Sequence, residues 1–158
     1  MKMFFYICNL INLKSDIMKK FLIGMILALA PLATFAQGVE GKWKLADGSA
    51  IVDVYQANGL YNGKIVWLQE PTEADGTPAV DKNNPDEKLR SRELMGLNLL
   101  SGLSQKSAND YSGGLIYDPG NGKTYYCSMT VDGDHLLVRG SLDKRGMFGR
   151  TMDWNRVK

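Results

Sequence analysis

Alternation of apolar and polar residues is the dominant pattern of the chain after residue 40. Segments of this period, interrupted by Gly, Asn and Asp, are typical of short antiparallel strands joined by tight turns. Asn58 and Gly59 give the clearest hairpin signal, because this pair tolerates the positive φ angles of a type I′ turn. The pattern predicts about eight strands, at residues 43–45, 51–55, 60–68, 97–103, 111–117, 124–131, 136–142 and 150–157.

This succession of strands predicts an all-β fold, because the segments between them lack helical periodicity. Regular short strands favour a closed barrel over an open sheet, since closure removes exposed strand edges. We therefore expect an antiparallel, eight-stranded, up-and-down β-barrel that forms a single domain over residues 37–158.

Residues 69–93 break the alternation. They are rich in charged residues, Pro, Asp and Asn, and contain few apolar side chains. Connections of this length inside a compact domain are usually functional or disordered. We expect a long surface loop after the third strand, with a short helical turn within residues 86–94.

The start of the chain has the pattern of a secretory signal peptide at residues 18–36. Lys19 and Lys20 precede an apolar run at residues 21–32, and small side chains follow up to Ala36. A basic start, a short apolar run and a small-residue site define such a signal. We expect cleavage after Ala36 and export to the periplasm or the extracellular space.

Residues 1–17 place a second apolar stretch ahead of this signal, which begins with its own methionine, Met18. We interpret residues 1–17 as a mis-assigned upstream extension; the alternative is a genuine cytoplasmic or membrane-facing segment. Downstream of residue 36 no apolar run reaches the length of a membrane-spanning helix, which is about 18 residues or more. We therefore expect no stable membrane insertion after cleavage.

Charge and cysteine content change the picture after cleavage. The whole chain carries a net charge of +2, but residues 1–36 contribute +3, so residues 37–158 carry −1. A nearly neutral domain gives no electrostatic case for binding nucleic acid. Cys127 is the single cysteine after residue 36, so no internal disulfide is expected. Its alternate spacing with apolar neighbours predicts a buried, inert thiol.

Four motifs in order carry a resemblance to a known family. They are Asp-Lys-Asn-Asn-Pro-Asp at 81–86, Leu-Arg-Ser-Arg-Glu-Leu-Met-Gly-Leu at 89–97, Gly-Gly-Leu-Ile-Tyr-Asp-Pro at 113–119 and Gly-Lys-Thr-Tyr at 122–125. On these motifs the chain resembles domain-of-unknown-function family 2147, small exported bacterial proteins, from Gly41 to Arg156. The resemblance implies a calycin-like barrel, related in shape to lipocalins and avidins, with no established activity.

Gly41, Lys42 and Trp43 are also similar to the Gly-x-Trp of the first lipocalin strand, whose Trp is commonly covered by an Arg from the last strand. The resemblance implies Arg156 as that Arg, and a structural role for Trp43, Trp154 and Arg156. The chain departs from true lipocalins in its shorter length, its lack of a disulfide pair and its polar insert after the third strand.

A polar cluster is predicted at one end of the barrel, because the long loop must fold back over a rim where its charges need partners. Arg90 and Arg92 could clamp an anion or pair with nearby carboxylates, and ion pairing is the favoured interpretation. The cluster could be a latch that closes the barrel end or a polar site at its mouth, and we favour the latch. Its predicted members are Asp81, Asn84, Arg90, Arg92, Asp118 and Tyr125.

Metal and catalytic motifs are weak. The oxygen-rich segment 81–86 lacks the spacing, central Gly and final Glu of an EF-hand loop. His135 is the only histidine, so neither a His-rich zinc site nor a Ser-His-Asp triad is predicted. Residues 120–124 end like a phosphate-binding loop but lack its spacing. We expect no cofactor and no metal.

The leading functional hypothesis is non-enzymatic binding of a small apolar or amphiphilic ligand inside the barrel. One alternative is an interaction or scaffolding module that uses the loop at 69–93. Another is a hydrolase of envelope polymers with an acid/base pair among Asp81, Asp86 and Asp118. Aromatic residues are numerous, and we expect most in the core and some around a cavity: Trp43, Tyr55, Tyr61, Trp67, Tyr125, Tyr126 and Trp154.

Overall fold

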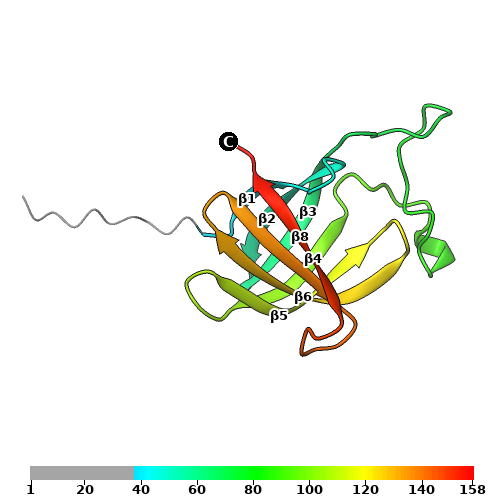
Figure 1. Cartoon of the computed structure of the whole chain (residues 1–158). Helices are drawn as coiled ribbons and strands as arrows, with labels where there is room; N and C mark the ends of the chain where they lie inside the picture. Colours follow the sequence, from blue (N-terminus) through cyan, green and yellow to red (C-terminus); the bar gives the residue numbers. More distant parts are fainter. Residues whose placement is uncertain (1–37) are drawn as a thin grey trace, which may run out of the picture. The chain divides into compact units, whose positions relative to one another are not determined.

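The computed structural model describes residues 38–158 (Figure 1). The signal-peptide prediction for 18–36 and the interpretation of 1–17 fall outside the described residues. The described part contains eight strands, β1 (Gly41–Lys44), β2 (Ala50–Ala57), β3 (Leu60–Leu68), β4 (Asn98–Gln105), β5 (Asp110–Asp118), β6 (Lys123–Asp132), β7 (His135–Ser141) and β8 (Gly149–Arg156).

The strands form a closed barrel in sequence order, each antiparallel to its neighbours. Closure is made between the first and last strands, where Trp43 of β1 pairs with Arg156 of β8. The prediction of an eight-stranded up-and-down barrel is therefore confirmed. The predicted hairpin at Asn58 and Gly59 is also present, with φ angles of 52° and 77°, in the left-handed region that such a turn requires.

One end of the barrel, which we call the closed end, is filled by side chains. Trp43 is fully buried there, and its indole N–H donates a 2.8 Å hydrogen bond to the carbonyl of Val39. The Arg156 guanidinium lies 3.9 Å from the centre of the Trp43 ring. Arg156 also donates to the carbonyls of Gly38 and Glu40. The segment before β1 is thereby held across this end of the barrel.

A β-bulge near the end of β3 reverses the direction of its last side chains. Val52 pairs with Ile65 and Ile51 pairs with Trp67, so Val66 has no partner on β2. An extra residue in one strand shifts the in/out alternation that follows it. Trp67 consequently lies on the outer wall, 40% exposed, and Leu68 turns towards the interior. Trp67 therefore lies neither in the core nor around the cavity, the two places expected for the aromatic set.

Tyr126 is also on the outer wall, 36% exposed, because it alternates with the buried Cys127 on β6. Of the predicted aromatic core residues, Trp43, Tyr61 and Trp154 are buried, and Tyr55 and Tyr125 are half-buried. Tyr111 was not in the predicted set but is fully in the core, edge-on to Tyr61. The alternation of apolar and polar residues thus predicts which side of the barrel wall a side chain faces only where the strand register is known.

The long connection between β3 and β4 is an ordered loop that extends from the barrel wall (Figure 1). Two isolated bridges, Thr72 with Pro78 and Val80 with Glu93, brace it. Its one helical turn, η1 (Glu87–Leu89), is capped by the Asp86 carboxylate. The expectation of a short helical turn within residues 86–94 is confirmed. Within residues 38–158, no helix is long and apolar enough to cross a membrane.

Candidate functional site

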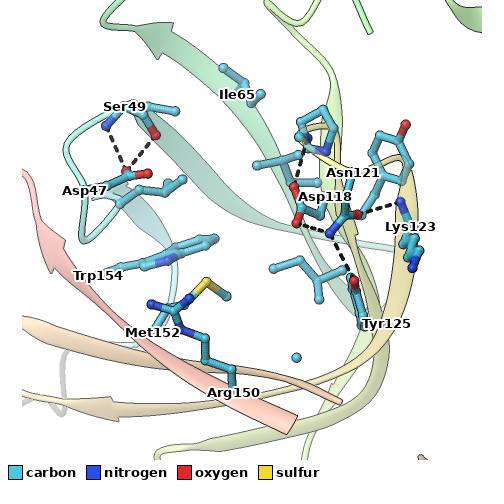
Figure 2. A pocket seen from close by; sticks show the side chains of 18 of the residues that line it. Asp47, Ser49, Ile65, Asp118, Asn121, Lys123, Tyr125, Arg150, Met152 and Trp154 are labelled. Atoms are coloured by element: carbon cyan, nitrogen blue, oxygen red, sulfur yellow. Dashed lines mark hydrogen bonds between the residues drawn. The ribbon is translucent and has the colours of Figure 1, made fainter. Parts of the chain in front are cut away.

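The other end of the barrel, which we call the open end, contains a cavity of about 1030 Å³. Three connections surround it together with the start of the long loop: residues 45–49, 119–122 and 142–148. Figure 2 shows Trp154 and Met152 of β8 on one side of the cavity and Ile65 of β3 across it. The inner wall is mainly apolar and includes Ala50, Ile65, Leu68, Leu99, Ile116 and Met152.

Small inward-facing residues explain why this half of the barrel is hollow. Gly140 on β7 faces inward, since a Cβ there would lie 3.4 Å from Ile116 and 3.7 Å from Tyr125. Ala50 begins β2 on the same cavity wall. In the closed half, by contrast, large side chains such as Leu103 and Met129 fill the interior. They also leave no space at the glycines there, since a Cβ on Gly114 would overlap Leu103. An eight-stranded barrel can be filled or can hold one small ligand, and side-chain size decides between the two here.

The β5–β6 turn forms a polar part of the cavity rim. The Asp118 carboxylate accepts from the Gly120 N–H at 2.9 Å and from the Asn121 amide at 2.8 Å. The same Asn121 amide donates to the Tyr125 hydroxyl at 3.1 Å. Figure 2 shows Asp118, Asn121 and Tyr125 and the hydrogen bonds between them on one side of the cavity. Asp118 and Tyr125, both predicted site residues, therefore meet through Asn121.

Opposite that turn, the β1–β2 turn presents Asp47. Its carboxylate accepts from the Ser49 hydroxyl at 2.7 Å and from the Ser49 N–H at 3.0 Å. The Ser49 hydroxyl bond is the main reason that the pKa of Asp47 lies below its ordinary value. This carboxylate is therefore ionised at neutral pH, and it accepts hydrogen bonds from within its own turn.

Arg150 is a cavity residue that the sequence reasoning missed. It alternates with Met152 and Trp154 on β8, and all three line the cavity (Figure 2). Among residues 38–158, no carboxylate lies within ion-pair distance of its guanidinium. Counting in steps of two from Trp154, already identified as structural, was the sequence signal that could have found it.

The long loop is fixed to the barrel through a buried carboxylate, Asp81. The Tyr117 hydroxyl donates to it at 2.7 Å, and the Asn84 amide donates at 2.7 Å. Arg92 contributes Nε at 2.9 Å and Nη2 at 2.8 Å to the Oδ2 atom of Asp81. Burial and the Asp81 carboxylate raise the pKa of Tyr117, so its hydroxyl stays protonated and donates. Asp81, Asn84 and Arg92 are thus brought together, with Tyr117 as a partner that was not predicted.

Arg90 has a different role from Arg92. Its Nε donates to the Asn84 backbone carbonyl at 2.9 Å, and its Nη1 lies 3.3 Å from the exposed Glu87 carboxylate. Within the described chain, neither arginine forms an ion pair with Asp118. The six predicted residues therefore form two clusters, one around Asp81 and one around Asp118.

Asn83 joins the two clusters. Its side-chain amide donates to the carbonyls of Pro119 and Gly120, at 3.1 and 3.0 Å. Its backbone carbonyl lies so close to Gly122 that a Cβ on that glycine would overlap it. The loop at 81–86 is thereby packed on the β5–β6 turn, next to the rim of the cavity.

These contacts bear on whether Asp81 or Asp86 could act as an acid or base and on whether the described residues could hold a metal ion. Asp81 has no exposed surface and is held by three donor side chains, whereas a general acid or base must reach its substrate. Asp86 caps η1. In the part of the chain that the structure describes, no three His, Cys, Asp or Glu side chains group as metal ligands would. His135 is exposed and faces Asp153 at 3.1 Å.

Cys127 behaves as predicted from its spacing. It is 4% exposed, and burial raises the pKa of its thiol from 9.0 to about 12. The reactive form of cysteine is the thiolate. Burial and the raised pKa thus support the expectation of an inert thiol.

A closed, up-and-down, eight-stranded antiparallel barrel with a cavity at one end is the architecture of lipocalin-like proteins. A solved structure supports this class: protein HP1028 of the human pathogen Helicobacter pylori, described as belonging to the lipocalin family, is 28% identical with a TM-score of 0.67. The match covers 76% of this chain and 83% of that one. Comparison with curated proteins finds no match.

The sequence model of the family described as "Uncharacterized protein conserved in bacteria (DUF2147)" matches residues 41–156. The chain therefore belongs to that family. The match spans the whole barrel, from the start of β1 to the end of β8. The resemblance stated from the four sequence motifs is confirmed.

Proposed function

We propose that the protein binds a small apolar or amphiphilic molecule in the open-end cavity and does so without catalysing a reaction. The observation that carries this proposal is the cavity itself, about 1030 Å³ with a mainly apolar wall. Pockets for small molecules are typically concave, mostly apolar and about 300–1,000 Å³ in volume. The lipocalin-like fold agrees with ligand binding in general.

The polar groups at the mouth favour an amphiphile over a purely apolar ligand. Arg150, Lys123 and Tyr125 all line the cavity, and Figure 2 shows Lys123 and Tyr125 on the side opposite Arg150. A carboxylate or phosphate at the end of an apolar chain would pair with the Arg150 guanidinium, whose donors match such groups in two-point contacts. The apolar chain would then lie against Ile116 and Met152.

The scaffolding alternative rests on the loop at 69–93. Its most buried polar side chains, Asp81 and Asn84, bond to Arg92 and Tyr117 within the protein. They hold the loop to the barrel and are not presented to a partner. The cavity is therefore the better supported basis for function.

We also propose that binding takes place in the bacterial envelope. The support is the signal-peptide pattern of residues 18–36. Fractionation of a bacterium that expresses the full chain, with N-terminal sequencing, tests this. We expect an exported protein that begins at Gln37; an uncleaved cytoplasmic protein would contradict it.

Ligand binding is tested by titrating the protein with a fatty acid that carries a fluorescent group. We expect saturable binding by the native chain and at least a tenfold loss of affinity for Gly140→Leu, which adds a side chain inside the cavity. Thr124→Leu is the matched control, because Thr124 is exposed on the outward side of β6. Absence of binding to the native chain, or equal binding by Gly140→Leu, would overturn the proposal.

The polar end of the ligand is tested with Arg150→Gln. We expect weaker binding of the fatty acid and unchanged binding of the corresponding alcohol, because only the acid presents a negative charge. Equal losses for both ligands would leave the cavity as the binding site but remove the role of Arg150.

A further inference from the structure

The loop between β7 and β8, residues 142–148, exposes apolar side chains to an unusual degree. Leu142, Met147 and Phe148 are 73%, 68% and 70% exposed. No other large apolar side chain of residues 38–158 is more than 42% exposed. Three such side chains on one short loop form an apolar tip in contact with water, which is unfavourable for an isolated protein. We call residues 142–148 the apical loop.

The apical loop is held in one conformation by two side chains. The Asp143 carboxylate accepts from three backbone N–H groups, those of Arg145, Met147 and Phe148, at 3.0, 3.2 and 2.8 Å. From β7, Arg139 donates to the Gly146 carbonyl through Nε at 2.8 Å and Nη2 at 2.6 Å. The apolar tip is therefore exposed even though hydrogen bonds fix the conformation of the loop that carries it.

Four cations lie in the apical loop or on the cavity wall. Lys144 and Arg145 belong to the loop, Arg150 follows it on β8, and Lys123 lies on the cavity rim. In the described part of the chain, none of these four pairs with a carboxylate. The one acidic residue of the loop, Asp143, is bonded to the loop's own N–H groups. Residues 142–150 thus carry three cations and one carboxylate, Asp143, whereas the carboxylates of Asp47, Glu70 and Asp118 belong to other segments of the cavity wall.

Apolar side chains in one loop with Lys and Arg match the surface of an anionic lipid bilayer. The apolar groups enter the boundary between headgroups and acyl chains, and the cations attract the phosphates. Leu142 and Phe148 also line the cavity, so a docked loop would bring the mouth against the lipid. We propose that the apical loop docks the open end of the barrel on an anionic phospholipid surface.

This proposal goes beyond ligand binding in the cavity. It rests on Met147, Lys144 and Arg145, which do not line the cavity, and on Leu142 and Phe148, which do. Docking would let an amphiphile pass between membrane and cavity without crossing water. A protein, such as a second copy of the chain, would be an alternative occupant of an apolar tip, but Lys144 and Arg145 within the same loop favour phospholipid. The two occupants predict different results in the experiment that follows.

Vesicle sedimentation tests the proposal. The protein used is residues 37–158, because the barrel closes and buries its core within residues 38–158, whereas the apolar segment 21–32 would bind lipid by itself. Vesicles of phosphatidylglycerol and phosphatidylcholine in equal parts are compared with vesicles of phosphatidylcholine alone. We expect at least tenfold stronger binding to the anionic vesicles, and weakening by added salt, because salt screens exposed charges.

Two variants identify the surface that binds. Met147→Ser with Phe148→Ser removes the apolar tip, and Lys144→Glu with Arg145→Glu reverses the charge. Each pair should lower anionic vesicle binding at least tenfold with an unchanged thermal melt. Leu60→Ser is the matched control, because Leu60 is a 40% exposed apolar residue at the closed end, and it should bind vesicles as the native barrel does.

Three results would overturn the proposal. The first is no sedimentation of the native barrel with anionic vesicles. The second is equal binding by the Met147→Ser, Phe148→Ser variant. The third concerns a second copy of the chain as the occupant. If the native barrel does not bind vesicles but forms a dimer in sedimentation equilibrium, and the same variant abolishes that dimer, the tip is an interface between two copies of the chain.

Discussion

The Arg92 guanidinium lies 2.8 Å from the Asp81 carboxylate, which has no exposed surface, while the Arg92 side chain is itself 36% exposed. The pair joins two segments of the long loop, since the Asp81 N–H also donates to the Arg92 carbonyl at 3.0 Å. Tyr117 of β5 completes the site by donating to the same carboxylate. The buried Asp81 carboxylate of the loop thus receives hydrogen bonds from a barrel residue, and these bonds fix the loop to the barrel wall.

Arg92→Ala should lower the free energy of unfolding by about 3 kcal/mol, because it leaves a buried carboxylate without its cation. Lys82→Ala is the control: Lys82 pairs with Glu73 at 3.4 Å, but its side chain is 67% exposed. Such a surface pair contributes about 1 kcal/mol or less. Urea unfolding of both variants measures the difference. Similar losses for the two would show that the Asp81 site does not hold the loop.

Gly122→Ala should destabilise the protein clearly more than Gly133→Ala. Both glycines have positive φ angles, +70° and +60°, so both substitutions cost about 1–2 kcal/mol for the left-handed conformation. At Gly133 a Cβ meets open space, whereas at Gly122 it would overlap the Asn83 carbonyl. Thermal unfolding of the two variants isolates this clash. Equal shifts in melting temperature would contradict the packing of the loop on the β5–β6 turn.

Cys127 should be unreactive in the folded protein. Burial raises the pKa of its thiol to about 12, so almost no thiolate is present at neutral pH. We expect an aromatic disulfide reagent to modify it only when urea unfolds the barrel, at a rate that follows the unfolded fraction. Rapid modification without urea would show that the thiol is accessible from the cavity or the surface.

The apical loop should lose order in acid. The Phe148 N–H is the main cause that lowers the pKa of Asp143 below its ordinary value of 3.8. A lowered pKa in the folded state means that the ionised carboxylate stabilises the loop at and above pH 3.8, and that this contribution is lost as the pH falls through the lower, folded value. The amide resonance of Phe148, followed by NMR against pH, should shift with a midpoint below 3.8. A midpoint at or above that value would contradict the bonded loop.

The barrel could be predicted from the sequence because its determinants are local. Alternation identifies each strand, and Asn58 with Gly59 specifies a tight turn by their own conformational preferences. The outward position of Trp67 was not foreseen, because the bulge opposite Ile51 and Val52 arises from pairing between strands. No single segment carries that information.

The candidate site was less predictable for the same reason. Asp81 and Tyr117 are 36 residues apart, and only the folded loop brings them together. The sequence indicated Arg92 and Asp81 as charges in need of partners, but not which partners they have. The cavity depends on small residues such as Gly140 facing inward opposite Ile116, and this requires the register of β5, β6 and β7. Arg150 was missed because its inward direction follows from that of Trp154, which lies four residues later on the same strand.

The central claim is that the open half of the barrel holds an amphiphile, and a crystal structure with a bromine-tagged fatty acid tests it most directly. Bromine at the end of the acyl chain gives an anomalous signal that locates the chain without interpretation of weak density. We predict bromine between Ile65, Ile116 and Met152, with the carboxylate at Arg150. A cavity without ligand at saturating fatty acid, or bromine found on the outer wall alone, would contradict the claim.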